Sequence, residues 1–164
     1  MPNKKKNHIV AIVMGSQSDY STMCYSKKVL KILKIKHEIK IVSAHRTPER
    51  LYQFAKTAEK NNISVVIAGA GGSAHLPGMI AAITKVPVIG VPIESKKLKG
   101  LDSLLSIAQM PKGIPVGTVA IGKDGAINAG LFAASIIALT NSKTRKNLYL
   151  WRKKQTRSVK KKPK

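Results

Sequence analysis

Residues 36–48, KHEIKIV followed by SAHRTP, decide the fold class because they lead from a strand directly into a helix. The alternating apolar residues of 36–42 predict the strand. Pro48 suits the first turn of a helix, where a missing N–H breaks no hydrogen bond, and Glu49 favours the positive end of the helix dipole. A strand joined so closely to a helix is the unit from which parallel α/β sheets are built.

The same unit recurs on both sides of this stretch. Short apolar runs, rich in β-branched residues, predict buried strands at 8–14, 63–68 and 86–91, and a fifth strand is expected at 117–121. Helices are expected from Ser16 or Ser18 to about Leu33, at 48–61, 74–84, 101–110 and 126–139, and from 143 onward. Strands alternating with helices predict an α/β fold, with one parallel sheet wrapped by helices on both faces.

Apolar residues three and four positions apart mark the inner faces of these helices. In the first two helices they are Met23, Val29, Leu30, Leu33, Leu51, Phe54, Ala55 and Ala58. Residues 126–139 are rich in alanine and apolar on nearly every side, which predicts burial on more than one side and packing against another subunit. Leu148 and Trp151 form a stripe too thin to fold alone, so the last helix is expected to dock on another element.

The composition points to one soluble domain with an aliphatic core. The chain has 164 residues, enough for a real core, and only 4% of them are aromatic. No apolar run reaches the length of a membrane span, and the lysine-rich start is not followed by the apolar region of a signal peptide. The lone cysteine, Cys24, excludes an internal disulfide and fits a reducing compartment. We therefore expect a cytoplasmic protein with no membrane partner.

A formal net charge of +23 is concentrated at the two ends of the chain. Residues 4–6 supply three positive charges, and residues 143–164 hold eleven Lys and Arg residues and no acidic residue. A basic face of this kind could bind nucleic acid or an anionic membrane surface. The chain has no aromatic-rich strand pair, GXXG clamp or zinc spacing, so no specific nucleic-acid function is predicted.

Polar residues follow the predicted strands at the points where the strands end. Parallel strands end at the same edge of a sheet, so these residues are expected to lie close together. Residues 15–19 (GSQSD) offer backbone N–H groups at a helix start, and Arg46 can close on a phosphate with bidentate geometry. Helix capping alone would explain Ser16 and Asp19. Together with Arg46, and with Asp19 accepting from sugar hydroxyls, the set predicts a ribose-phosphate site.

His45 is the candidate general acid and base, because histidine exchanges protons near neutral pH and this one lies in a loop after a strand. His75 could cap its own helix or shape the pocket, whereas His8 and His37 lie on predicted strands. Residues 69–73 (GAGGS) follow the third strand, and their glycines let the backbone approach a flat ligand. No metal site is predicted, since the histidines lack metal spacing and no Cys/His or paired-carboxylate cluster occurs.

Four long motifs, in order, resemble the class I 5-(carboxyamino)imidazole ribonucleotide mutases of purine biosynthesis. The motifs are MGSQSD at 14–19, SAHRTP at 43–48, AGAGGSAHLPGM at 68–79 and DSLLSIAQMP at 102–111. The match covers about residues 9–140, and Leu148, Trp151 and Arg152 look like the C-terminal helix of that family. The resemblance implies a flavodoxin-like, three-layer fold, a homo-octamer, and a reaction without cofactor, metal or ATP.

The resemblance also implies a role for each site residue. The carboxylate would move from the exocyclic nitrogen to carbon 4 of the aminoimidazole ring, by loss of carbon dioxide and recarboxylation, with His45 as general acid and base. The residues implied to hold the ribose phosphate are Ser16, Asp19, Ser43 and Arg46. Those implied to shape the pocket for the ring and carbon dioxide are Gly71, Gly72, Ser73 and His75. Residues 102–111 are similar to the segment that closes sites between subunits.

This interpretation divides the chain into a basic N-terminal extension (1–7), a flavodoxin-like catalytic domain (8–142), a C-terminal helix that packs on a neighbouring subunit (143–158) and a basic disordered tail (159–164). Two alternatives stay open. The related class II carboxylase would use aminoimidazole ribonucleotide and carbon dioxide directly. A nucleotide- or RNA-binding module would keep the fold without catalysis, but such a module is expected to lack His45 or Arg46, and both are present.

Overall fold

In the computed structural model, which describes residues 8–163, five parallel strands form a sheet. The strands are β1 (Ile9–Met14), β2 (His37–Ile41), β3 (Ile63–Gly71), β4 (Val88–Ile93) and β5 (Gly117–Thr118). Their order across the sheet is β2-β1-β3-β4-β5, and every neighbouring pair is parallel. This is the flavodoxin-like order, so the predicted fold class is confirmed. The predicted basic extension (1–7) and residue 164 of the predicted tail lie outside the described residues.

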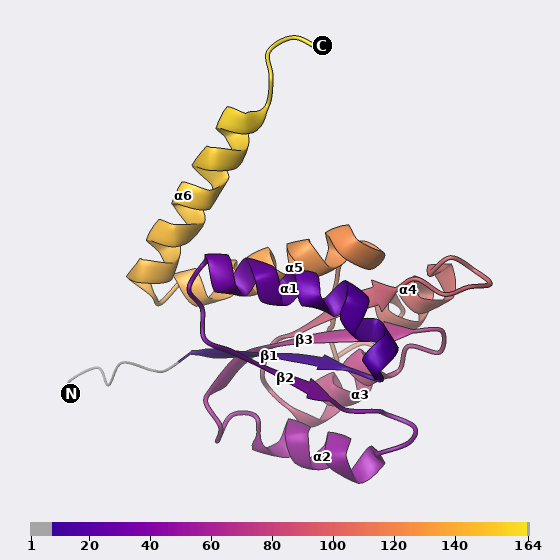
Figure 1. Ribbon diagram of the computed structural model, residues 1–164. Helices are drawn as coiled ribbons and strands as arrows, with labels where there is room; N and C mark the ends of the chain where they lie inside the picture. The colour runs from indigo at the N-terminus through magenta and orange to yellow at the C-terminus, as the bar shows by residue number, and fades with distance from the viewer. Residues whose placement is uncertain (1–7, 164) are drawn as a thin grey trace, which may run out of the picture.

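Helices cover both faces of the sheet and make three layers (Figure 1). They are α1 (Tyr20–Ile32), α2 (Pro48–Thr57), α3 (Leu76–Ile83), α4 (Leu101–Ala108), α5 (Gly122–Ala138) and α6 (Ser142–Ser158), with a short 3-10 turn, η1 (Gln17–Asp19), before α1. One core joins the sheet to α1, α5 and α6, and a second joins it to α2, α3 and α4. Along β1, Val10 and Ile12 enter the first core and Ala11 and Val13 the second, because side chains alternate along a strand.

The inner positions predicted for the first two helices are all buried, which confirms the predicted helix faces. α1 and α5 approach each other closely because Gly130 of α5 carries no side chain. A Cβ at Gly130 would stand 3.0 Å from the side chain of Val29 and 3.3 Å from the carbonyl oxygen of Ser26. The buried Ser26 hydroxyl donates to the carbonyl of Ala126 at 2.6 Å and ties the two helices together.

Several predicted boundaries differ from the structure: α5 begins at Gly122 instead of residue 126, β3 runs on to Gly71, and β4 spans Val88–Ile93. α2 ends at Thr57 instead of continuing to residue 61, because the chain folds back in a tight turn. In that turn the amide of Ile63 donates to the carbonyl of Ala58 at 3.0 Å, and Asn62 adopts a left-handed φ of 59°, which asparagine tolerates better than most residues. The predicted fifth strand is shorter than expected and keeps only the two residues of β5.

The last helix docks on the α1–α5 layer through its first half and then leads away from the domain (Figure 1). The side-chain amide of Asn147 donates to the carbonyl of Leu33 at 2.9 Å. Leu148 is buried and Trp151 packs against the same core, so the predicted stripe does dock. Every residue at 152–163 is exposed, and 159–163 contain neither helix nor strand.

Candidate active site

A cavity of about 520 Å³ opens at the carboxyl edge of the sheet. The loops after β1, β2, β3 and β4 line it, on either side of the point where the chain changes direction across the sheet. Ligands of doubly wound sheets bind at this position. All nine site residues expected from the sequence line the cavity: Ser16, Asp19, Ser43, His45, Arg46, Gly71, Gly72, Ser73 and His75. The fold thus brings together three loops that are far apart in the sequence.

The loop after β1 contributes hydroxyl groups and one carboxyl group. The backbone N–H of Ser16 donates to Oδ2 of Asp19 at 3.1 Å, and the hydroxyls of Ser16 and Ser18 lie 2.6 Å apart. Burial raises the pKa of the Asp19 carboxyl above its ordinary value of 3.8, although hydrogen bonds from Ser16 and the charge of Arg46 act to lower it. Asp19 therefore caps its own helix start and also faces the cavity.

Arg46 links the loop after β2 to the loop after β1. Its Nε donates to the Ser43 hydroxyl at 3.2 Å, and one Nη donates to the carbonyl of Gly15 at 3.2 Å. A guanidinium carries five N–H donors, so further donors remain for a ligand. Among residues 8–163 there is one ion pair, between Lys40 and Glu38. Within that part of the chain, no carboxylate oxygen therefore lies within 4.0 Å of the Arg46 guanidinium. The arrangement suits an anion such as a phosphate.

His45 and His75 form a pair across the cavity, from the loops after β2 and β3. Nε2 of His45 and Nδ1 of His75 lie 2.8 Å apart, and the ring planes meet at 86°. One of these nitrogens must donate and the other accept, so the two rings share one proton at this contact. Both side chains are exposed to the cavity, and each keeps a second ring nitrogen for other partners. The pair can therefore take up and release protons next to a bound ligand.

The glycine-rich loop after β3 closes another side of the cavity. Gly72 has a φ of 66°, a conformation that L side chains rarely adopt, and a Cβ there would meet no atom within 4 Å. Sequence reasoning missed the end of β4 and the loop that follows it, since Ile93, Glu94 and Ser95 also line the cavity. The rule that located the other loops, that parallel strands end at one edge, would have found these residues as well.

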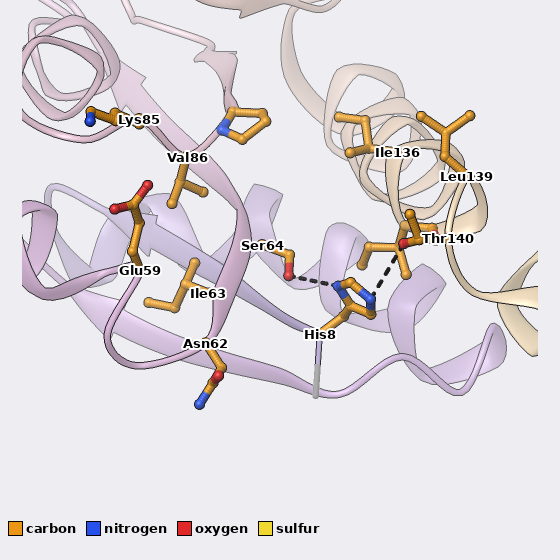
Figure 2. Close-up of a pocket in the computed structure, with 12 residues that line it drawn as sticks. His8, Glu59, Asn62, Ile63, Ser64, Lys85, Val86, Ile136, Leu139 and Thr140 are labelled. Carbon is orange, nitrogen blue, oxygen red and sulfur yellow. Dashed lines mark hydrogen bonds between the residues drawn. The ribbon is translucent and has the colours of Figure 1, made fainter. Parts of the chain in front are cut away.

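A second cavity, of about 500 Å³, lies at the opposite edge of the sheet, between the starts of β1 and β3 and the end of α5. Figure 2 shows the His8 ring between Ser64 and Thr140. Nδ1 of His8 lies 2.8 Å from the Ser64 hydroxyl and Nε2 lies 3.4 Å from the Thr140 hydroxyl. Both ring nitrogens of His8 thus have partners within the fold, and the chemistry-bearing loops are at the other edge.

Over residues 8–163, His, Cys, Asp and Glu side chains form no group of three or more that could hold a metal ion. In the same part of the chain, no helix is long and apolar enough to cross a membrane.

The sheet order defines a flavodoxin-like α/β protein, and serine, arginine, histidine and glycine line its cavity at the carboxyl edge of the sheet. A family model described as AIR carboxylase matches residues 9–158. This chain belongs to the AIR carboxylase family.

Individual relatives agree with this assignment. N5-carboxyaminoimidazole ribonucleotide mutase of Escherichia coli (strain K12) is 58% identical over 150 residues, which cover 92% of this chain and 89% of the relative. The protein of the same name from Brucella melitensis biotype 1 is 58% identical over 154 residues, covering 94% of this chain and 95% of the relative. A crystal structure of Treponema denticola PurE superposes with a TM-score of 0.83 at 28% identity, over 92% of each chain.

Proposed function

We propose that this protein converts 5-(carboxyamino)imidazole ribonucleotide to 5-amino-1-(5-phosphoribosyl)imidazole-4-carboxylate in purine biosynthesis. The observation that carries the proposal is the His45–His75 pair, 2.8 Å apart, in one cavity with the guanidinium of Arg46. A proton-exchanging pair beside an anion site matches a phosphorylated substrate that must move one proton. Relatives at 58% identity, covering nearly the whole chain, carry the name of this mutase.

The reaction proceeds in two steps, with His45 as general acid and base. The N–C bond of the carbamate breaks, carbon dioxide leaves, and the electron pair on the exocyclic nitrogen takes a proton from His45. Carbon 4 of the aminoimidazole ring then attacks carbon dioxide, and the proton on carbon 4 passes to His45, which regains its starting state. Because the same group gives and takes the proton, the overall change is an isomerisation. His75 holds the other end of the shared hydrogen bond and orients the His45 ring.

The substrate phosphate binds the loops after β1 and β2. Arg46 supplies the positive charge, and Ser16 and Ser43 supply hydroxyls at the edge of the cavity. Asp19 accepts hydrogen bonds from the ribose hydroxyls. Binding the phosphate and ribose in this way fixes the aminoimidazole ring of the substrate next to the His45 side chain. The reacting atoms are then already in position.

Carbon dioxide stays in the cavity between the two steps. Gly71, Gly72, Ser73 and His75 form the wall next to the ring, where backbone without bulky side chains allows close contact. A closed pocket keeps a small neutral intermediate from escaping before carbon 4 attacks it.

Closure of the pocket fits a homo-octamer in which neighbouring subunits cover one another. Leu101 and Leu105 on α4 are about half exposed, as is Phe132 on α5, and exposed apolar surface of this kind is what a subunit interface would cover. The helix at 143–158 would pack on a neighbouring subunit through the half that leaves the domain. Sedimentation velocity at micromolar concentration tests this: a single species of eight subunits is expected, and a monomer would contradict it.

The proposed division of the chain is a basic extension (1–7), a catalytic domain (8–142), the packing helix (143–158) and a basic tail (159–164). The reaction takes place in the cytoplasm, a reducing compartment that suits the lone thiol of Cys24.

A spectrophotometric assay with two substrates tests the proposal. The carboxyamino compound is offered alone, and aminoimidazole ribonucleotide is offered with carbon dioxide or bicarbonate. Fast conversion of the first and slow use of the second are expected. Fast use of the free amine with carbon dioxide would make the protein a class II carboxylase. If the folded protein turned over neither substrate, it would be a binding module without catalysis.

A further inference from the structure

A buried serine, Ser103 on α4, holds the glycine-rich loop that lines the active-site cavity. Its side chain is 0% exposed, and it is absent from the cavity wall. The Ser103 hydroxyl accepts a hydrogen bond from the backbone N–H of Gly72 at 2.9 Å and donates to the carbonyl of Ile93 at 2.7 Å. One hydroxyl thus joins the loop after β3 to the end of β4.

The place of this hydroxyl in the sheet explains its importance. The pairing of β3 with β4 ends at Gly71 and Ile93, so Gly72 is the first residue beyond the sheet. There the chain turns with a φ of 66°, and the sheet no longer holds its amide. The Ser103 hydroxyl takes the place of the missing partner and extends the hydrogen bonding by one residue. An amide that is partly buried and left without a partner costs free energy, so the bond fixes the start of the loop.

The same serine is itself held in place by the loop after β4. Its backbone N–H donates to Oδ1 of Asp102 at 2.9 Å, and that oxygen also accepts from the Ser95 hydroxyl at 2.7 Å. Ser95 lines the cavity. The first turn of α4 therefore connects two walls of the site through Gly72 on one side and Ser95 on the other.

We propose that Ser103 is a positioning residue for the reaction: it sets the Gly72 backbone against the substrate ring and keeps the carbon dioxide pocket tight. The expected effect on catalysis rests on the proposed function. The expected effect on the Gly72 loop rests only on the two hydrogen bonds of the Ser103 hydroxyl. Ser103 touches no reacting atom. Its effect passes through the peptide of Gly72 and, further along the loop, through His75.

The test compares two buried serines that differ in position. In Ser103→Ala the hydroxyl beside the site is lost. The matched control is Ser26→Ala, in which an equally buried hydroxyl is lost at the contact between α1 and α5, away from the cavity. Both variants are expected to unfold at lower urea concentration than the parent protein. Only Ser103→Ala is expected to lower kcat/KM, by at least tenfold, since small displacements of a positioned group have large kinetic effects.

The fate of the intermediate separates positioning from general loss of stability. With a loosened pocket, Ser103→Ala is expected to release part of the substrate as free aminoimidazole ribonucleotide and carbon dioxide instead of the C4 carboxylate. Ser26→Ala should release no more than the parent protein. Equal kcat/KM and equal release in the two variants would overturn the proposal. Ser103→Cys, which keeps a weak donor and acceptor of similar size, is expected to give an intermediate release and serves if the alanine variant does not fold.

Hydrogen exchange tests the structural part without any turnover. The Gly72 amide in the substrate-free parent protein is expected to exchange slowly, and Ser103→Ala should speed its exchange by at least tenfold while Ser26→Ala leaves it unchanged. Fast exchange in the parent protein would refute the role of Ser103. If exchange behaves as expected but the parent protein does not convert the carboxyamino compound, the proposed function fails and the hydrogen-bond assignment stands.

Discussion

Replacing Arg46 with alanine tests the anion site most directly. Two of its five donors contact protein oxygens, at Ser43 and Gly15, each at 3.2 Å, and the other three have no hydrogen-bond partner among residues 8–163. A phosphate held by two of them gains two charge-assisted hydrogen bonds. Because the side chain is exposed and water competes, each bond is assigned the lower end of the usual range, about 1.5 kcal/mol.

Arg46→Ala then loses about 3 kcal/mol of binding free energy, which corresponds to roughly a 100-fold rise in the KM for the carboxyamino substrate. The control Arg46→Lys keeps the charge but loses the bidentate geometry, so a rise of roughly tenfold is expected. Initial rates over a range of substrate concentrations give KM and kcat for both variants, and titration calorimetry with the product gives the affinity separately. Circular dichroism checks that the loop substitution leaves the fold intact.

The result that would refute this reasoning is a KM within about threefold of the parent value together with a large fall in kcat. Such an outcome would assign Arg46 to the chemical step and leave the phosphate to other groups. A rise in KM of equal size for the alanine and lysine variants would instead show that the fork of the guanidinium, and not its charge, carries the binding.

Three further predictions concern other parts of the molecule. His45→Asn should lower kcat by at least 100-fold with product affinity unchanged within a few-fold, and loss of affinity instead would make His45 a binding residue. Since burial raises the folded-state pKa of Asp19, its carboxyl destabilises the fold once ionised, that is, as the pH rises through that pKa. Asp19→Asn should therefore raise the urea midpoint at pH 7, with the gain shrinking as the pH falls toward 3.8, and a constant difference would contradict this. Gly130→Ala places a Cβ 3.0 Å from Val29 and should destabilise the fold by about 1–3 kcal/mol in urea unfolding, partly relieved by adding Val29→Ala.

The parts of the site found from the sequence share a simple geometric cause. Ser16 and His45 follow β1 and β2, and Gly71 is the last residue of β3, and parallel strands deliver such residues to one edge whatever the rest of the chain does. The same reasoning stopped one strand early and left out Glu94 and Ser95. The boundary of α2 was placed too far along because the apolar spacing continues through Ala58, while backbone hydrogen bonds after Thr57 close a turn.

Hydrogen bonds between distant segments could not be predicted in this way. The His45–His75 bond joins residues 30 positions apart, and the bond from Gly72 to Ser103 spans 31. Both depend on the exact offset of one strand against the next and on how α4 sits over the end of β4. An error of one residue in that offset would turn every side chain of the strand to the other face.

The sequence by itself determined the fold class, the inner faces of the first helices, and the edge at which the functional loops meet, because strand and helix periodicities and the parallel connection rule are local properties of the chain. The tertiary structure alone decided how those loops act together. It paired the two histidines, turned Arg46 toward the loop after β1 and placed a buried hydroxyl behind Gly72. These contacts arise from packing between distant segments, where the position of each atom depends on the whole core.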